Sequence, residues 1–203
     1  MSRALQIGTV ALAAVTVLSA CSGGSNPAGS SPSSTAAAAT GTSAQGGEAP
    51  KVPAALPTAA LISNACTALA TGQMNELGMA PPGKPSTNAG GPTCQWNGAT
   101  NTSNSAFINV MTANKSGLSD IYANNDNKEY AYFEPVTIDG YPGVYAEPTD
   151  DRSQGSCTAW IGVTDQLAVG VAMILLTGAN RANPCDSANK VATAMIEHLK
   201  SAA

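Results

Sequence analysis

The stretch CTAWIGVTDQLAVGVAMILL, residues 157–176, decides the fold class of this chain. Every second side chain in its first half is small or apolar and faces the same way, namely Cys157, Ala159, Ile161 and Val163. After a turn at Asp165-Gln166, residues 167–176 are apolar on both faces. A membrane helix needs about 20 residues, so this shorter run predicts a central strand of a sheet that is covered on both sides.

The second of these strands has one face of small residues, Ala168, Gly170 and Ala172. Small side chains on a buried strand indicate that another group approaches the backbone closely. That group is either a helix packed on the sheet or a ligand in a groove, and the sequence leaves both alternatives open.

The chain ends with NPCDSANKVATAMIEHLK, residues 183–200, which has the features of an amphipathic helix. Asn183 is a suitable N-cap, Pro184 fits the first helical position, and Asp186 suits the positive end of the helix dipole. One stripe at helical spacing is formed by Cys185, Ala188, Ala192, Met195 and Leu199. We expect this helix to lie on the sheet.

The remaining segments complete an α+β fold. Residues 61–79 predict a helical segment with Ile62, Cys66 and Leu69 on one stripe, and residues 80–92 predict a loop rich in Pro and Gly. Further elements are a short helix at 116–125 and strands at 93–97, 106–112, 133–138 and 141–147, the last two joined by an Asp139-Gly140 turn. The prediction is an antiparallel sheet of about five to six strands, packed with an N-terminal and a C-terminal helix.

Residues 1–20 have the features of an export signal, with Arg3 followed by a run rich in Ala, Val and Leu. Leu18-Ser19-Ala20-Cys21 resembles a bacterial lipobox, which implies cleavage before Cys21 and lipid attachment to its thiol. Two or three acyl chains anchor a protein durably to a membrane. A retained membrane anchor and a plain secretory signal are the alternatives.

Residues 21–56 follow as a lipidated cysteine and a linker dominated by Ser, Gly, Ala, Pro and Thr, which we expect to be disordered. Residues 57–203 are long enough for one domain with its own core. Without residues 1–20 the chain has eight basic and thirteen acidic residues, a formal charge of −5. This negative charge argues against nucleic-acid binding, so the expected membrane contact is the lipid at Cys21.

Four further cysteines, Cys66, Cys94, Cys157 and Cys185, predict two disulfides in an exported domain. Three pairings are possible. We favour Cys66–Cys94 and Cys157–Cys185, because the strand cysteines point to the core and the others lie on the helix stripes expected to pack there. A zinc site is disfavoured, since the chain contains no C-x₂-C pair and His198 is its only histidine. We expect no metal and no cofactor.

No catalytic constellation is recognisable, so we do not expect an enzyme. His198 lies late on the last helix between Glu197 and Leu199, where we expect a solvated surface histidine, and Asp150-Asp151 lies in a polar loop. Tyr130, Tyr132 and Phe133 crowd together between two acidic residues. They form either core packing at a hairpin edge or a surface for a partner.

Five segments together carry a family resemblance: ACTAL, CQW, VTIDGYPGV, CTAWIGV and NPCDSA. The domain resembles the actinobacterial lipoproteins of the domain of unknown function DUF3558, among them the LprB- and LprC-type mycobacterial lipoproteins. The resemblance implies an envelope lipoprotein and no particular activity. By analogy, a sheet-plus-helix sandwich similar to the PsbP-like proteins is the expected architecture.

These observations predict an extracytoplasmic, membrane-anchored lipoprotein that acts as a binding or accessory module of the cell envelope, for a lipid or another small ligand. The alternative is a structural lipoprotein that contacts envelope proteins and binds no small molecule. A closed core with an exposed aromatic patch would favour the alternative, and a cavity would favour the binding module.

We predict that Cys21→Ala releases the protein from membranes, because the lipid is its expected attachment. Fractionation of expressing cells into membrane and soluble material measures this directly. Mutant protein that still sediments with the membranes would contradict the anchor assignment.

Overall fold

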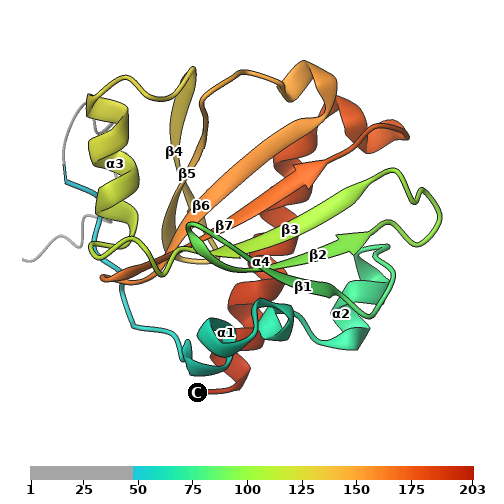
Figure 1. Ribbon diagram of the computed structural model, residues 1–203, viewed down its shortest axis with the longest axis horizontal. Helices are drawn as coiled ribbons and strands as arrows, with labels where there is room; N and C mark the ends of the chain where they lie inside the picture. The colour runs from blue at the N-terminus through green and yellow to red at the C-terminus, as the bar shows by residue number, and fades with distance from the viewer. Residues whose placement is uncertain (1–47) are drawn as a thin grey trace, which may run out of the picture. The chain divides into compact units, whose positions relative to one another are not determined.

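A computed structural model describes residues 48–203, so Cys21 and the predicted signal lie outside the described residues (Figure 1). One antiparallel sheet holds seven strands in the order β1-β2-β3-β7-β6-β5-β4. The strands are β1 (Lys84–Asn88), β2 (Gly91–Asn97), β3 (Ser105–Val110), β4 (Tyr132–Ile138), β5 (Tyr141–Glu147), β6 (Ser156–Thr164) and β7 (Leu167–Ile174). The helices are α1 (Ala59–Ser63), α2 (Thr71–Glu76), α3 (Leu118–Asp126) and α4 (Pro184–Ser201), with 3₁₀ turns η1 (Ala65–Ala68), η2 (Arg152–Gln154) and η3 (Ala179–Ala182). The predicted α+β class is confirmed, with more strands than expected.

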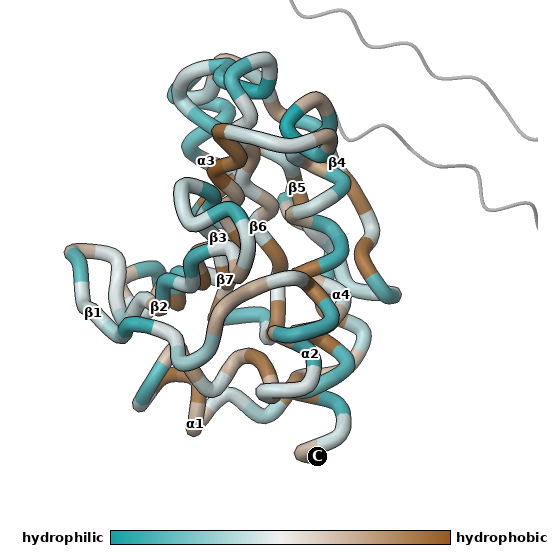
Figure 2. Tube along the Cα trace, turned by 90° about the vertical axis from the view of Figure 1, so that its right-hand side faces the viewer, coloured by the Kyte–Doolittle hydropathy of each residue, from teal (hydrophilic) through white to brown (hydrophobic). Residues whose placement is uncertain are grey.

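The β6–β7 hairpin lies at the centre of the sheet, as its apolar sequence predicts. Ala159 pairs with Val171 and Ile161 with Val169, while β3 pairs with the other edge of β7. Figure 2 shows β6 and β7 between α3 and α4. Because β7 has strand neighbours on both edges and a covered face on each side, residues 167–173 are largely withdrawn from water, whereas Ile174 at the end of the strand is 39% exposed.

Helix α4 packs along the face of β7 that carries Val169, Val171 and Met173. Its buried residues are Pro184, Ala188, Val191, Ala192, Met195, Ile196 and Leu199, which include most of the predicted stripe. Pro184 occupies the first turn as predicted. Asn183 is the N-cap residue, but its side chain makes no capping hydrogen bond.

At Gly170 the small-residue face of β7 is covered by a side chain of the neighbouring strand. Gly170 pairs with Trp160, and a Cβ atom at position 170 would lie 2.7 Å from the indole ring. The indole Nε1 donates to the carbonyl oxygen of Ala146 at 2.9 Å, which fixes the ring in this place. The close approach inferred from the sequence is therefore that of Trp160, not of α4, which lies on the opposite face.

The N-terminal helical segment is interrupted, which corrects the single stripe predicted for residues 61–79. Asn64 adopts an extended conformation with φ −155° and ψ 107°, and its side chain accepts a hydrogen bond from Cys66 N at 3.0 Å. This local bond competes with the helix and separates α1 from η1. As a result Leu61 is fully buried, whereas the predicted stripe residue Ile62 is 43% exposed.

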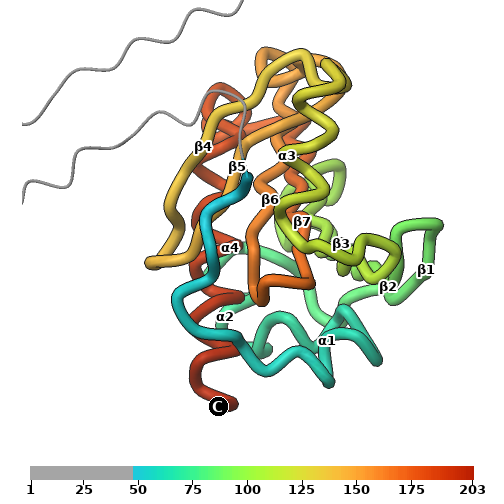
Figure 3. Tube along the Cα trace, turned by 90° about the vertical axis from the view of Figure 1, so that its left-hand side faces the viewer, coloured from blue at the N-terminus to red at the C-terminus, as the bar shows by residue number. Residues whose placement is uncertain are grey.

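The segment 80–92, predicted as a loop, contains strand β1, and every residue of this strand is exposed to solvent. The segment after residue 48, which falls within the predicted linker 21–56, contacts the domain (Figure 3). Val52 N donates to Asp165 Oδ1 at 3.0 Å, and Leu56 N donates to Val163 O at 2.9 Å. These bonds fix the chain beside the β6–β7 turn before it enters α1.

Two disulfides join Cys66 to Cys94 and Cys157 to Cys185, as predicted, with Cα–Cα distances of 5.0 and 5.1 Å. Each closes a loop of 28 positions. In the chain-entropy model a loop of this size contributes about 3.5 kcal/mol to stability. The first disulfide attaches η1 to β2, and the second attaches the start of α4 to β6.

We predict that Gly170→Ala destabilises the protein by about 1–3 kcal/mol, because the new methyl group would displace the hydrogen-bonded Trp160 ring. Urea unfolding measures the change. Gly72→Ala is the matched control, since nothing lies within 4 Å of a Cβ atom there. In helix α2 this control should stabilise by about 0.5–1 kcal/mol. Equal effects of the two substitutions would contradict the role of Gly170.

A candidate ligand pocket beside helix α4

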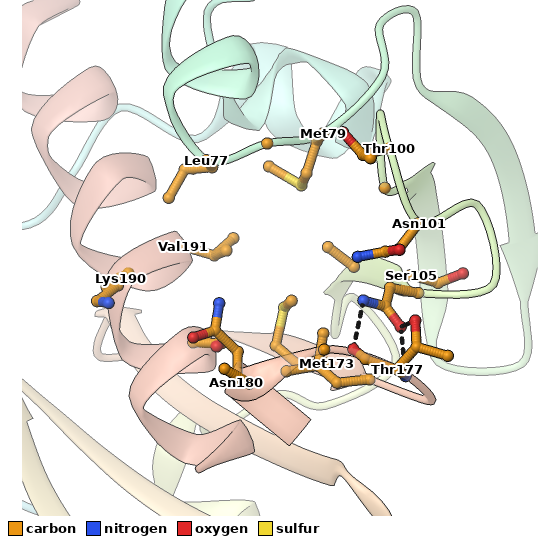
Figure 4. A pocket seen from close by; sticks show the side chains of 18 of the residues that line it. Leu77, Met79, Thr100, Asn101, Ser105, Met173, Thr177, Asn180, Lys190 and Val191 are labelled. Carbon is orange, nitrogen blue, oxygen red and sulfur yellow. Dashed lines mark hydrogen bonds between the residues drawn. The ribbon is translucent and has the colours of Figure 1, made fainter. Parts of the chain in front are cut away.

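A pocket of about 420 Å³ opens between α4, the end of β7 and the loop that connects β2 to β3 (Figure 4). Residues 76–79 at the end of α2 form its upper wall in this view, and residues 98–106 form the right-hand wall. Residues 177–180 and α4 complete the enclosure. The volume lies within the range of about 300–1,000 Å³ that is usual for small-molecule sites.

The apolar part of the lining, called the floor below, consists of Met79, Met173, Leu175 and Val191 and is already well packed. Met79 and Met173 face the space from opposite walls (Figure 4). They are 4% and 7% exposed, and Leu175 and Val191 beside them are 5% and 3% exposed. None of the lining residues is aromatic. The floor therefore offers flexible aliphatic and thioether contacts and no flat ring surface.

The rim is polar and contains two exposed amides. Asn101 and Asn180 both extend into the space, as Figure 4 shows. Neither side chain makes a hydrogen bond to another of the described residues. Glu76 and Lys190 are the charged lining residues, and both are exposed. The rim thus combines free hydrogen-bonding groups with one charge of each sign.

Hydrogen bonds between the walls preform the pocket. The Asn104 amide joins the β2–β3 loop to the segment after β7, donating to Thr177 O and accepting from Thr177 N, each at 3.1 Å. Gln73 Nε2 donates to Ala194 O at 2.8 Å and so attaches α2 to α4. A backbone hydrogen bond from Ala99 N to Gly78 O, 2.8 Å long, joins the β2–β3 loop to the segment after α2. A site held in this way needs little ordering when a ligand arrives.

Tyr130, Tyr132 and Phe133, for which the sequence left core packing or a partner surface open, do not form one patch, and Tyr132 is buried while the other two are half-buried. Tyr130 and Phe133 pack with Tyr122 of α3, the Phe133 and Tyr122 rings meeting edge to face at 4.8 Å. Tyr132 lies on the opposite face of β4, because successive strand residues alternate. None of the three lines the pocket.

Tyr132 belongs to a cluster of paired polar groups. Its hydroxyl donates to Glu147 Oε2 at 3.0 Å, and the Arg152 guanidinium lies 4.0 Å from the ring centroid. Arg152 also pairs with Glu134 and Asp150 at 2.7 Å each. Burial, reinforced by the Glu147 carboxylate, raises the pKa of the Tyr132 phenol above its usual value, and hydrogen bonds from Arg152 lower the pKa of the Asp150 carboxyl. These pairs hold the end of the β4–β5 hairpin together.

The other sequence-predicted residues are likewise distributed away from the pocket. Ala168, Gly170 and Ala172 lie on the sheet face opposite α4, and none of them lines the pocket. His198 is half-buried on α4, and Asp151 accepts a hydrogen bond from Thr149 in an exposed loop.

Between residues 48 and 203 no group of three or more His, Cys, Asp or Glu side chains is placed to hold a metal ion. Over the same range no helix is long and apolar enough to cross a bilayer.

Sequence reasoning missed the pocket because four separate segments of the chain form it, 76–79, 98–106, 173–180 and 187–191. The segments NTSN at 101–104 and TGAN at 177–180 are dense in amides and hydroxyls, which is their only local signal. Such composition is typical of any turn. What distinguishes these residues is that the fold brings the two loops face to face, and neither loop encodes this contact alone.

We predict that Asn104→Ala lowers the free energy of unfolding by about 1 kcal/mol, because it removes the bonds that join two pocket walls. Asn101→Ala is the matched control from the same loop. It should change stability by less than about 0.5 kcal/mol. Urea unfolding of both variants tests this, and a larger effect at Asn101 would contradict the assignment of the two amides.

Comparison with known proteins places the chain in a family. No curated protein and no solved structure matches it. A family model described as a protein of unknown function, DUF3558, matches residues 16–198, which is most of the chain. The protein therefore belongs to the DUF3558 family.

Proposed function

We propose that this protein is a lipid-anchored, extracytoplasmic binding module that holds a small ligand in the pocket beside α4. The observation that carries the proposal is the pocket itself, which has an apolar floor, a polar rim and walls joined by hydrogen bonds. Apolar sites with a few placed polar groups are the usual form of small-molecule sites.

The lipobox-like Leu18-Ser19-Ala20-Cys21 supports the anchored location, and the family match beginning at residue 16 includes it. Because residues 52 and 56 are bonded to the domain, the linker is reduced to residues 21–47, and a Gly/Ser-like coil of roughly 27 residues would have a reach of about 26–31 Å. That reach would keep the pocket clear of the lipid headgroups. In this proposal the lipid on Cys21 supplies the membrane contact. An actinobacterial cell envelope, in the manner of the LprB- and LprC-type lipoproteins, is the proposed setting.

The composition of the pocket supports binding over catalysis. Its lining residues include the exposed Glu76 and Lys190 and the hydroxyls of Thr100, Ser105, Thr177 and Ser187, but no histidine, cysteine or tyrosine. Among the described residues none of these hydroxyls is hydrogen-bonded to a lysine or a carboxylate that could activate it. General acid–base catalysis requires a positioned proton donor and acceptor, and covalent catalysis requires an activated nucleophile. The lining side chains can hold a molecule through apolar contacts and hydrogen bonds, and these are sufficient for a binding module.

We predict that protein exported from an actinobacterial host carries a bound small molecule. Native mass spectrometry of the Cys21→Ala chain, collected without detergent, should show an added mass that organic extraction removes. Adding Ala179→Trp should abolish this mass, because Ala179 lines the pocket and the indole would fill it.

Ala182→Trp is the matched control, since Ala182 is an exposed alanine of the same turn η3 but does not line the pocket. This variant should keep the added mass and the unfolding midpoint of its parent. A bare polypeptide in all three proteins, or a mass that survives Ala179→Trp, would count against the pocket as the functional site.

A further inference from the structure

We infer that the pocket takes an uncharged amphiphile, whose flexible acyl or alkyl chain lies between Met79 and Met173 and whose head bonds to Asn101 and Asn180. This inference rests on the proposed binding function and adds the chemical class of the ligand. It follows from three features of the lining residues, namely the two methionines, the lack of a ring surface and the chemistry of the rim.

The methionines favour a flexible apolar chain. Met79 enters from the segment after α2 and Met173 from β7, so the two side chains face each other across the space (Figure 4). Unbranched thioether side chains adapt to irregular apolar shapes because they have three rotatable bonds. Leu175 and Val191 extend the same apolar surface. An alkyl chain would meet apolar atoms on both sides at this position.

The lining residues disfavour a ligand recognised mainly by its rings. Flat ligands gain specific energy by stacking on aromatic faces, and the lining set contains no Phe, Tyr or Trp. The aromatic cluster of Tyr122, Tyr130 and Phe133 packs within its own contacts and does not line the space. A chain is therefore the better match to this floor than a sugar or a nucleobase.

The rim favours an uncharged head that carries hydroxyl or ester oxygens. An amide side chain both donates and accepts hydrogen bonds, and Asn101 and Asn180 have no other partner among the described residues. Glu76 on α2 and Lys190 on α4 oppose each other in sign, so the rim has no net charge to select an ion. An anionic head would exchange its water for neutral amides on a rim where one carboxylate and one ammonium cancel, so it would gain no net charge attraction for the loss of hydration.

Monoacylglycerols with hexanoyl, octanoyl and decanoyl chains are suitable probes, titrated below their micelle concentrations into the Cys21→Ala protein by calorimetry. Each CH₂ that becomes buried should strengthen binding about fourfold until the pocket is filled. Decanoate should bind at least tenfold more weakly than the decanoyl glyceride. Asn101→Ala with Asn180→Ala should weaken every glyceride about tenfold and leave the dependence on chain length unchanged.

Ala179→Trp should abolish glyceride binding, and Ala182→Trp should preserve it. Affinity that is independent of chain length would overturn the apolar-chain assignment, and decanoate binding as tight as glyceride binding would overturn the uncharged head. If no glyceride binds but the native mass is still lost on Ala179→Trp, the ligand class is wrong and the binding function stands. If the protein carries no added mass, or if that mass is not lost on Ala179→Trp, the binding function itself fails.

Discussion

The burial of the β6–β7 hairpin on both faces is the constraint on which the rest of the structure depends. Its residues are apolar on both sides of β7, so each face needs its own cover. Helix α4 supplies one cover with a stripe of small and medium side chains. Trp160 supplies much of the other cover, because its ring lies over Gly170. A larger residue at position 170 and a smaller one at 160 would each leave this face badly packed.

The two disulfides connect this core to the pocket. Cys157 pairs across the hairpin with Met173 of the pocket floor, and its partner Cys185 lies two residues before the lining residue Ser187. The bond therefore sets the distance between the floor and the α4 wall. Cys94 is two residues before Trp96, which pairs with Ala106 on the opposite side of the floor. Reduction of either bond would release a segment that positions the site.

The structure shows which sequence signals were sufficient and which were not. The β6–β7 strands and α4 were predictable because burial imposes a repeat of two or of about 3.6 residues on the sequence. Strand β1 was not, since all five of its residues are exposed and bear no such repeat. The break at Asn64 depends on one side-chain hydrogen bond. The pocket depends on the meeting of Asn104 with Thr177, 73 positions apart, and no local pattern encodes that contact.

The packing of the floor also constrains how a ligand can bind. Met79, Met173, Leu175 and Val191 are only 3–7% exposed, so a ligand can remove little further protein surface from water. The hydrophobic gain must then come chiefly from the ligand's own apolar surface, which is why affinity should follow the length of its chain. Walls that are already joined avoid an ordering cost, and the exposed rim leaves a path for release. Under the proposed binding function, these properties would favour exchange of the ligand over permanent retention.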